Sequence, residues 1–88
     1  MRIDDFLSTI GVIKRRTVAK ELADAGLILI NGAKAKPSRD VQTQDRIFIK
    51  GKQQLELLVL AVPTGNVARA NRADYFQLLS SPASFDEE

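Results

Sequence analysis

Four basic side chains stand close together near the start of the chain, Lys14, Arg15, Arg16 and Lys20, in the stretch KRRTVAK. Arg16 and Lys20 are four residues apart, where side chains on a helix are neighbours and like charges repel each other. Binding of a polyanion is the chemistry that such a cluster supports, because phosphate groups neutralise the repulsion. The alternative is a solvated helix face on which Lys20 pairs with Asp24, and the charges alone favour neither interpretation.

The composition argues against catalysis and metal binding. The chain of 88 residues predicts one small domain with a modest core, and it contains neither cysteine nor histidine. Disulfides, thiolate metal sites, a cysteine nucleophile and the commonest general base are therefore excluded. The neighbouring Asp4 and Asp5 diverge on a helix, so they do not form an acid–base pair. We expect no catalytic residue, no metal site and no cofactor, and hence a binding protein that is not an enzyme.

Charge is distributed unevenly along the chain. Within a formal net charge of +2, residues 1–54 carry an excess of basic side chains and residues 55–88 an excess of acidic ones. The basic part suggests a polyanionic partner. No apolar run reaches membrane-spanning length, and the start MRIDDFL places two acids where a signal peptide needs an apolar core. We therefore expect a cytoplasmic protein without membrane contact.

Two helices are predicted at the N-terminus. Apolar residues recur at positions i, i+3, i+4 and i+7 over residues 3–10, which is typical of an amphipathic helix. Asp4 and Asp5 lie in its first turn, where the helix dipole favours acids. The second helix is predicted over residues 15–25, and a glycine follows each helix, at a position where left-handed backbone ends helices.

A helical wheel predicts which side of the second helix is buried. Val18, Leu22 and Ala25 form the expected buried stripe, and Arg16 and Lys20 fall on the opposite side. A polyanion can approach such a charged face closely. Unpaired backbone N–H groups at the start of this helix attract phosphate as well.

A β-hairpin is predicted directly after the second helix. The apolar run over residues 27–30 is followed by Asn31-Gly32, the strongest short hairpin signal, because a type I′ turn needs positive φ at both positions. The partner strand covers residues 33–36, and its two lysines share one face. Protection of an edge strand is the alternative reason for such lysines. These two lysines are Lys34 and Lys36.

The rest of the chain completes an α+β fold. Two more strands are predicted over residues 46–50 and 54–62, and a helix over residues 67–79, capped by Asn66. The expected fold is a monomeric small single domain, with two N-terminal helices packed on a mostly antiparallel sheet and a C-terminal helix added to it. Its expected parts are a domain over residues 1–62, a C-terminal helix packed on it over residues 63–80, and a disordered acidic tail over residues 81–88.

The order of these segments resembles a known RNA-binding family. RIDDFL, KRRTVAKELADAG, LILING and DRIFI together are similar to the S4-type RNA-binding domain, named after a ribosomal small-subunit protein and also called the alpha-L RNA-binding motif. The match covers roughly residues 1–50. Within the family, IKRRTVAKELADAGLILINGAKAKPS resembles the short stand-alone bacterial members called RqcP, and RADYFQLL resembles their C-terminal helix.

The resemblance implies a role in ribosome-associated quality control. Such members associate with the large ribosomal subunit that carries an obstructed peptidyl-tRNA. They bind its rRNA and hold the tRNA in the P-site region. Their partner is an RqcH/NEMF-type tailing factor, which adds C-terminal alanine tails to the stalled nascent chain. RNA is then recognised by shape and backbone.

The resemblance also implies which side chains contact RNA. Arg2 and Arg16 match the family pattern best and are the first candidates for rRNA contacts. Asp4 is a candidate for orienting one of these arginines. The further candidates, taken from the basic helix start and the hairpin, are Lys14, Arg15, Lys20, Lys34 and Lys36.

Other functions stay open at this point. Within RNA binding, the alternatives are a heat-shock-type recycler of blocked large subunits and a general rRNA or tRNA binder. The heat-shock relative usually has a longer basic C-terminal extension, whereas this chain ends in acidic residues. An alternative of another class is a protein-interaction module whose apolar strand over residues 55–62 docks on a partner.

Asp5 stands where the family usually has lysine. We predict that Asp5→Lys strengthens binding to the tRNA-bearing large subunit or leaves it unchanged, because a negative charge near phosphates is replaced by a positive one. The opposing effect, loss of an acid at a helix N-terminus, amounts to about 0.3–1 kcal/mol at most. Affinity is measured at two salt concentrations and folding separately. A clear loss of affinity in a well-folded variant contradicts the transfer of the family's RNA surface onto the first helix.

Overall fold

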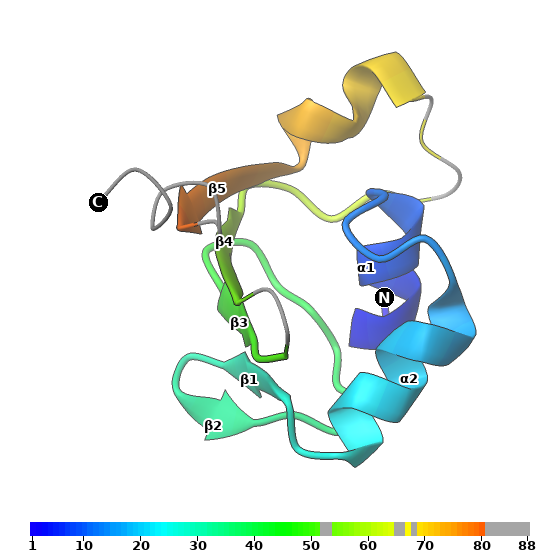
Figure 1. The fold of residues 1–88 in the computed structure, drawn as a ribbon. Helices are drawn as coiled ribbons and strands as arrows, with labels where there is room; N and C mark the ends of the chain where they lie inside the picture. The colour runs from blue at the N-terminus through cyan, green and yellow to red at the C-terminus, as the bar shows by residue number, and fades with distance from the viewer. Residues whose placement is uncertain (52–53, 65–66, 68, 81–88) are drawn as a thin grey trace.

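Two helices cover one face of a five-stranded antiparallel sheet in the computed structural model, which describes residues 1–51, 54–64, 67 and 69–80. The helices are α1 (Ile3–Thr9) and α2 (Arg16–Asp24), and they lie on the same side of the sheet (Figure 1). The sheet has the strand order β2-β1-β3-β4-β5. Its strands are β1 (Ile28–Ile30), β2 (Ala33–Lys34), β3 (Arg46–Ile49), β4 (Leu55–Val59) and β5 (Phe76–Ser80).

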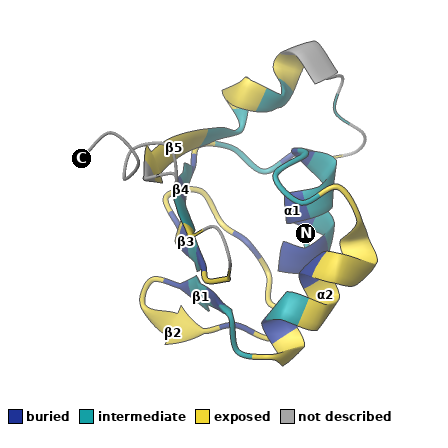
Figure 2. Ribbon diagram, in the orientation of Figure 1, coloured by how far each residue is buried: buried dark blue, intermediate teal, exposed yellow. Residues whose placement is uncertain are grey.

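The core lies between α1 and the sheet. The apolar residues predicted to form one side of the first helix are all buried, which confirms that helix. Alternate residues of the central strands meet them, and the register pairs Ile30 with Ile47 and Ile47 with Leu57. Figure 2 shows the buried residues gathered in α1 and the central strands. Each such side chain contributes about 1.5–3 kcal/mol by leaving water, so this layer fixes α1 on the sheet.

The buried side of α2 differs from the prediction. Ala19 and Ala23 are buried, Leu22 is half-buried, and the predicted stripe residues Val18 and Ala25 are exposed. Alanine side chains are small, so a helix that packs through them can approach its neighbour closely. Close packing on α1 therefore decides the orientation of α2, and the larger Val18 is left outside.

The predicted hairpin turn is confirmed. Asn31 and Gly32 have φ values of 52° and 86°, as a type I′ turn requires. The Asn31 side chain also ties this turn to β3: its amide nitrogen donates to the buried Asp45 carboxylate (3.0 Å), and its oxygen accepts from the Arg46 backbone nitrogen (3.0 Å). The turn residue thus fixes the start of the neighbouring strand.

The hairpin's second strand is shorter than predicted. It ends at Lys34, and Ala35 is buried while Ala33 is exposed at the edge of the sheet. Pro37 follows closely and is itself buried. Proline has no N–H group to continue a ladder, so the chain turns away and its backbone meets α1, where the Asp4 nitrogen donates to the Pro37 oxygen (3.4 Å).

The predicted C-terminal helix over residues 67–79 is wrong. Arg69–Asp74 form a 3₁₀-helix, η1, and the chain then forms strand β5, which pairs antiparallel with β4. Leu78 and Leu79 of this strand are exposed. Without β5 the backbone groups of β4 would form an open sheet edge, so pairing with a distant strand outweighs the local helical pattern. The predicted cap Asn66 and the tail over residues 81–88 lie outside the described residues.

We predict that Asn31→Gly, which tolerates the positive φ of this position, lowers the free energy of unfolding by about 1–3 kcal/mol, because it removes two hydrogen bonds and leaves the buried Asp45 carboxylate with fewer partners. Gln42→Ala is the matched control, since only the Gln42 backbone nitrogen donates to Asp45. Denaturant unfolding compares the two variants. Equal stability of the Asn31 and Gln42 variants contradicts the assignment.

Candidate nucleic-acid interface

A buried carboxylate joins the beginnings of the two helices. The Asp4 side chain is 2% exposed. Its Oδ2 accepts a hydrogen bond from Arg2 Nη2 at 3.2 Å, and its Oδ1 lies 3.6 Å from Arg16 Nε. Oδ1 also accepts from the Asp5 backbone nitrogen at 2.7 Å. Asp4 therefore holds Arg2, from just before α1, and Arg16, the first residue of α2. We call this arrangement of three side chains the Asp4 junction.

Both arginine side chains are partly exposed to solvent. The Arg2 and Arg16 side chains are 45% and 50% exposed. A buried carboxylate is costly unless it is paired and hydrogen-bonded, and here two guanidinium groups and one backbone N–H group satisfy it. Guanidinium groups are planar forks that match phosphate oxygens. Held by one carboxylate, the pair forms a positively charged surface that is ordered before a ligand arrives and that suits a phosphate group.

The corrected orientation of α2 explains why Arg16 reaches Asp4. Arg16, Ala19 and Ala23 occupy positions i, i+3 and i+7, so they lie on one side of the helix. Because the two alanines pack into the core, Arg16 lies at the edge of the buried side, next to α1. The sequence prediction placed Arg16 opposite the buried stripe, which was wrong because the stripe was centred on Val18.

The start of α2 is open to an anion. Arg15 is the N-cap residue, no side chain caps the helix, and its first turn contains no acidic residue. Its unpaired N–H groups and the positive end of the helix dipole attract phosphate. Arg15 is exposed at the same place, so backbone donors and a guanidinium group act there together.

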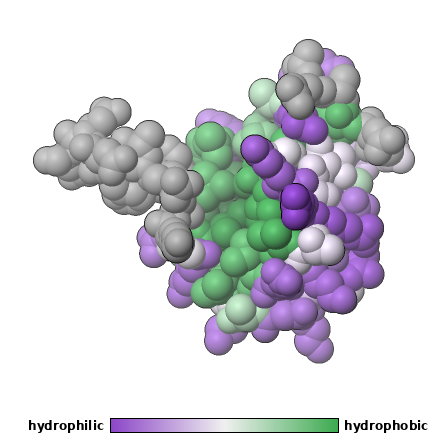
Figure 3. Space-filling view, turned by 45° about the vertical axis from the view of Figure 1, so that its right-hand side comes forward, coloured by the Kyte–Doolittle hydropathy of each residue, from purple (hydrophilic) through white to green (hydrophobic). Residues whose placement is uncertain are grey.

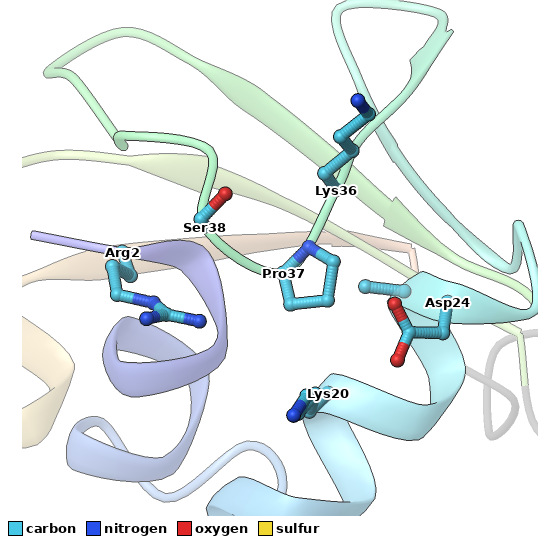
Figure 4. Close-up of a pocket in the computed structure, with 7 residues that line it drawn as sticks. Arg2, Lys20, Asp24, Lys36, Pro37 and Ser38 are labelled. Carbon is cyan, nitrogen blue, oxygen red and sulfur yellow. The ribbon is translucent and has the colours of Figure 1, made fainter.

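A cleft with a volume of about 450 Å³ lies beside these arginines, between the start of α1, α2 and the loop after the hairpin. Figure 4 shows Arg2 and Asp24 directed toward the ring of Pro37, whereas Lys36 reaches away from it. Three of the lining side chains are cationic and one is acidic, so the cleft favours an anion. The lining residues are Arg2, Lys20, Ala23, Asp24, Lys36, Pro37 and Ser38.

The predicted RNA-binding residues therefore divide into groups. Arg2, Lys20 and Lys36 line the cleft, and Arg16 is tied to Arg2 through Asp4. The two lysines of the hairpin separate: the Lys34 side chain crosses Gly26, where its ammonium nitrogen is 3.5 Å from the place a Cβ would take. A cation at the end of α2 is favoured by the helix dipole, and Lys34 lies there, outside the lining of the cleft.

Lys14 and Arg72 lie in a place that the sequence prediction did not separate from the rest. Lys14 lies apart from the cleft, in a separate hollow with Arg72. Arg72 was missed as a site residue, since it comes from the acidic part of the chain and the segment was predicted to be a continuous α-helix. No sequence pattern predicts that Arg72 lies near the end of α1, because only the three-dimensional path of η1 brings it there.

Asp5 points along α1 instead of toward the arginines. Its Oδ1 accepts a hydrogen bond from Thr9 Oγ1 at 3.4 Å, one turn further along the helix. Within the described ranges, no group of acidic side chains is arranged to hold a metal ion. The helices found there are also too short or too polar to cross a membrane.

We predict that Asp4→Asn weakens RNA binding although it removes a negative charge, because the two arginines lose the carboxylate that positions them. Asp5→Asn is the matched control, since it removes the same charge from the same helical turn without touching an arginine. Affinity is measured well below the melting temperature of both variants. Stronger binding by the Asp4 variant, as simple charge removal requires, contradicts the positioning role.

The part of the chain that builds this site matches a known family. The family model of the S4 domain matches residues 1–47. That range contains α1, α2 and the hairpin, and it reaches into β3. All elements that build the Asp4 junction and the cleft therefore lie within the matched range.

Full-length relatives cover more of the chain. It is 36% identical over 80 residues to the RQC P-site tRNA stabilizing factor of Streptococcus pneumoniae, covering 91% of each chain. It is 42% identical over 67 residues to the factor of the same name from Helicobacter pylori, covering 73% of this chain and 77% of that one. The identity to the Bacillus subtilis factor is 51% over 55 residues, covering 62% and 64%.

Solved structures show the same fold. The solution structure of the hypothetical protein HP1423 has a TM-score of 0.78 and 34% identity, covering 91% of this chain and 98% of that one. The trimeric structure of Vibrio cholerae Heat Shock Protein 15 has a TM-score of 0.82 at 19% identity, covering 99% and 87%, which is a likeness of fold alone. The chain therefore belongs to the S4 domain family and, within it, to the family of the RQC P-site tRNA stabilizing factors.

Proposed function

We propose that the protein binds the rRNA of the large ribosomal subunit together with an obstructed peptidyl-tRNA in the P-site region, and so supports ribosome-associated quality control. The observation that carries the proposal is the buried Asp4 carboxylate, which holds Arg2 and Arg16 at the surface beside the uncapped start of α2. The names of the relatives, which refer to stabilisation of P-site tRNA, support it.

The geometry suits recognition of RNA by shape. Helical RNA hides its base edges in a deep, narrow groove and offers its phosphates and ribose hydroxyl groups instead. The cleft and the Asp4 junction offer guanidinium, ammonium and backbone N–H donors, which match phosphate oxygens. Binding of this kind requires no catalytic group, and we propose a non-enzymatic role.

Further partners belong to the same proposal. We infer that an RqcH/NEMF-type tailing factor acts on the same blocked subunit and adds alanine tails while this protein stabilises the tRNA. The protein acts as a cytoplasmic monomer in this proposal. A heat-shock-type recycler of blocked subunits is the alternative within RNA binding, and dependence on the P-site tRNA distinguishes the two.

A protein-interaction module that docks through the apolar strand fits the structure less well. Strand β4 lies between β3 and β5, so both of its edges are paired, and its Leu57 and Val59 are in the core. Figure 3 shows a continuous apolar area next to a strongly hydrophilic side of the molecule. The exposed apolar residues Val18 and Leu78 lie on α2 and β5 and not on β4.

The test compares large subunits with and without peptidyl-tRNA. We predict tighter binding to the tRNA-bearing subunit, an affinity that falls steeply with salt, and a loss of about 1–3 kcal/mol in binding free energy for Arg16→Ala. Arg46→Ala is the matched arginine control, because Arg46 pairs with Glu56 at 3.3 Å on the sheet face away from the helices.

Each result discriminates between the candidate functions. Equal binding to both subunits indicates a general rRNA binder. Equal effects of the Arg16 and Arg46 substitutions contradict the site, and an affinity that does not change with salt favours the protein-interaction module. Thermal unfolding of the Arg16 variant is measured in parallel, since its contact with Asp4 contributes to stability as well.

A further inference from the structure

A second cationic hollow lies at the far end of α1 from the Asp4 junction. It has a volume of about 510 Å³ and is lined by Ser8, Gly11, Lys14 and Arg72. Lys14 belongs to the segment that leads into α2, and Arg72 belongs to η1. Chain segments that are distant in sequence thus bring two positive charges to one place.

Arg72 is held in an unusual position. A Cβ atom on residue 11 would lie 2.6 Å from Arg72 Nη1, so the guanidinium group occupies space that only glycine leaves free. Gly11 also has φ of 80°, in the left-handed region that favours glycine. Arg72 Nε is buried, and in the described part of the chain it has no hydrogen-bond partner. An unpaired buried N–H donor is costly, and the described residues supply no acceptor for this one.

No carboxylate of the described ranges forms an ion pair with Arg72 or Lys14. The Ser8 hydroxyl donates to the Asp5 carbonyl oxygen at 3.1 Å, so the hollow's charged donors are the guanidinium and ammonium groups. An acceptor-only anion fits such a pair, and a phosphate group offers several acceptor oxygens. The alternative to an anion site is a structural role for these two cations, because a cation near the end of a helix is favoured by the helix dipole.

We propose that the Lys14–Arg72 hollow is a second phosphate-binding site for the RNA backbone. It rests on the proposed function and names a contact beyond the Asp4 junction. The seven residues of α1 span about 10 Å at 1.5 Å per residue, so one phosphate does not reach both ends. The RNA therefore contacts the protein at both ends of α1, through Arg2 and Arg16 of the Asp4 junction at its start and through Lys14 and Arg72 at its end.

The experiment measures affinity for the tRNA-bearing large subunit and its salt dependence. We expect Lys14→Gln and Arg72→Gln each to weaken binding roughly threefold to tenfold, and the double variant to reduce the salt slope by about 1. Arg72→Lys keeps the charge and restores part of the affinity. Lys50→Gln is the matched control, because Lys50 is exposed at the end of β3, outside both cationic sites.

Thermal unfolding separates the structural role from the binding role. If Arg72→Gln lowers the melting temperature while Lys14→Gln binds as the wild type does, Arg72 is structural and the proposal is overturned. Lys14 is exposed, so its substitution tests binding even if the Arg72 variant fails to fold. Wild-type binding by the Lys14 and Arg72 variants, with weakened binding by Arg16→Ala, overturns this site alone. Wild-type binding by all three variants overturns the proposed function.

Discussion

The need to pair one buried carboxylate determines how the two helices meet. Asp4 is almost completely enclosed, and its charge is balanced by Arg2 and Arg16. Removing either arginine leaves the buried charge less well compensated, which is costly. The packing of α2 on α1 through Ala19 and Ala23 is therefore coupled to the same interaction that fixes the two guanidinium groups at the surface.

Local patterns in the sequence were sufficient for the elements that depend on neighbouring residues. The periodicity of α1, the Asn31-Gly32 turn and the strand predicted over residues 46–50 all agree with the structure. The orientation of α2 was not predictable in this way. Hydropathy ranks Val18 above alanine, but the approach of two helices selects small side chains, so burial followed packing instead of hydropathy.

The C-terminal part depended on contacts between distant residues. A helical pattern over residues 67–79 did not indicate that β4 requires a partner along its open edge, which β5 supplies. The same pairing places η1 near α1 and so brings Arg72 to Gly11. The sequence singled out Arg2, Lys14, Lys20 and Lys36, which line the two hollows, but it could not assign them to two ends of one helix, because that division arises only from the three-dimensional path of the chain.

The cationic side chains differ in what they lose on binding. A guanidinium group held by a buried carboxylate has already lost much of its rotamer freedom, whereas an exposed lysine loses its own when it meets a phosphate. Arg2 and Arg16 therefore suit a contact that fixes the orientation of the RNA. Exposed lysines such as Lys20 and Lys36 suit a long-range attraction that salt weakens. Arg72, packed against Gly11, resembles Arg2 and Arg16 in having lost rotamer freedom before binding. The end of α1 is therefore expected to orient the ligand as well as attract it.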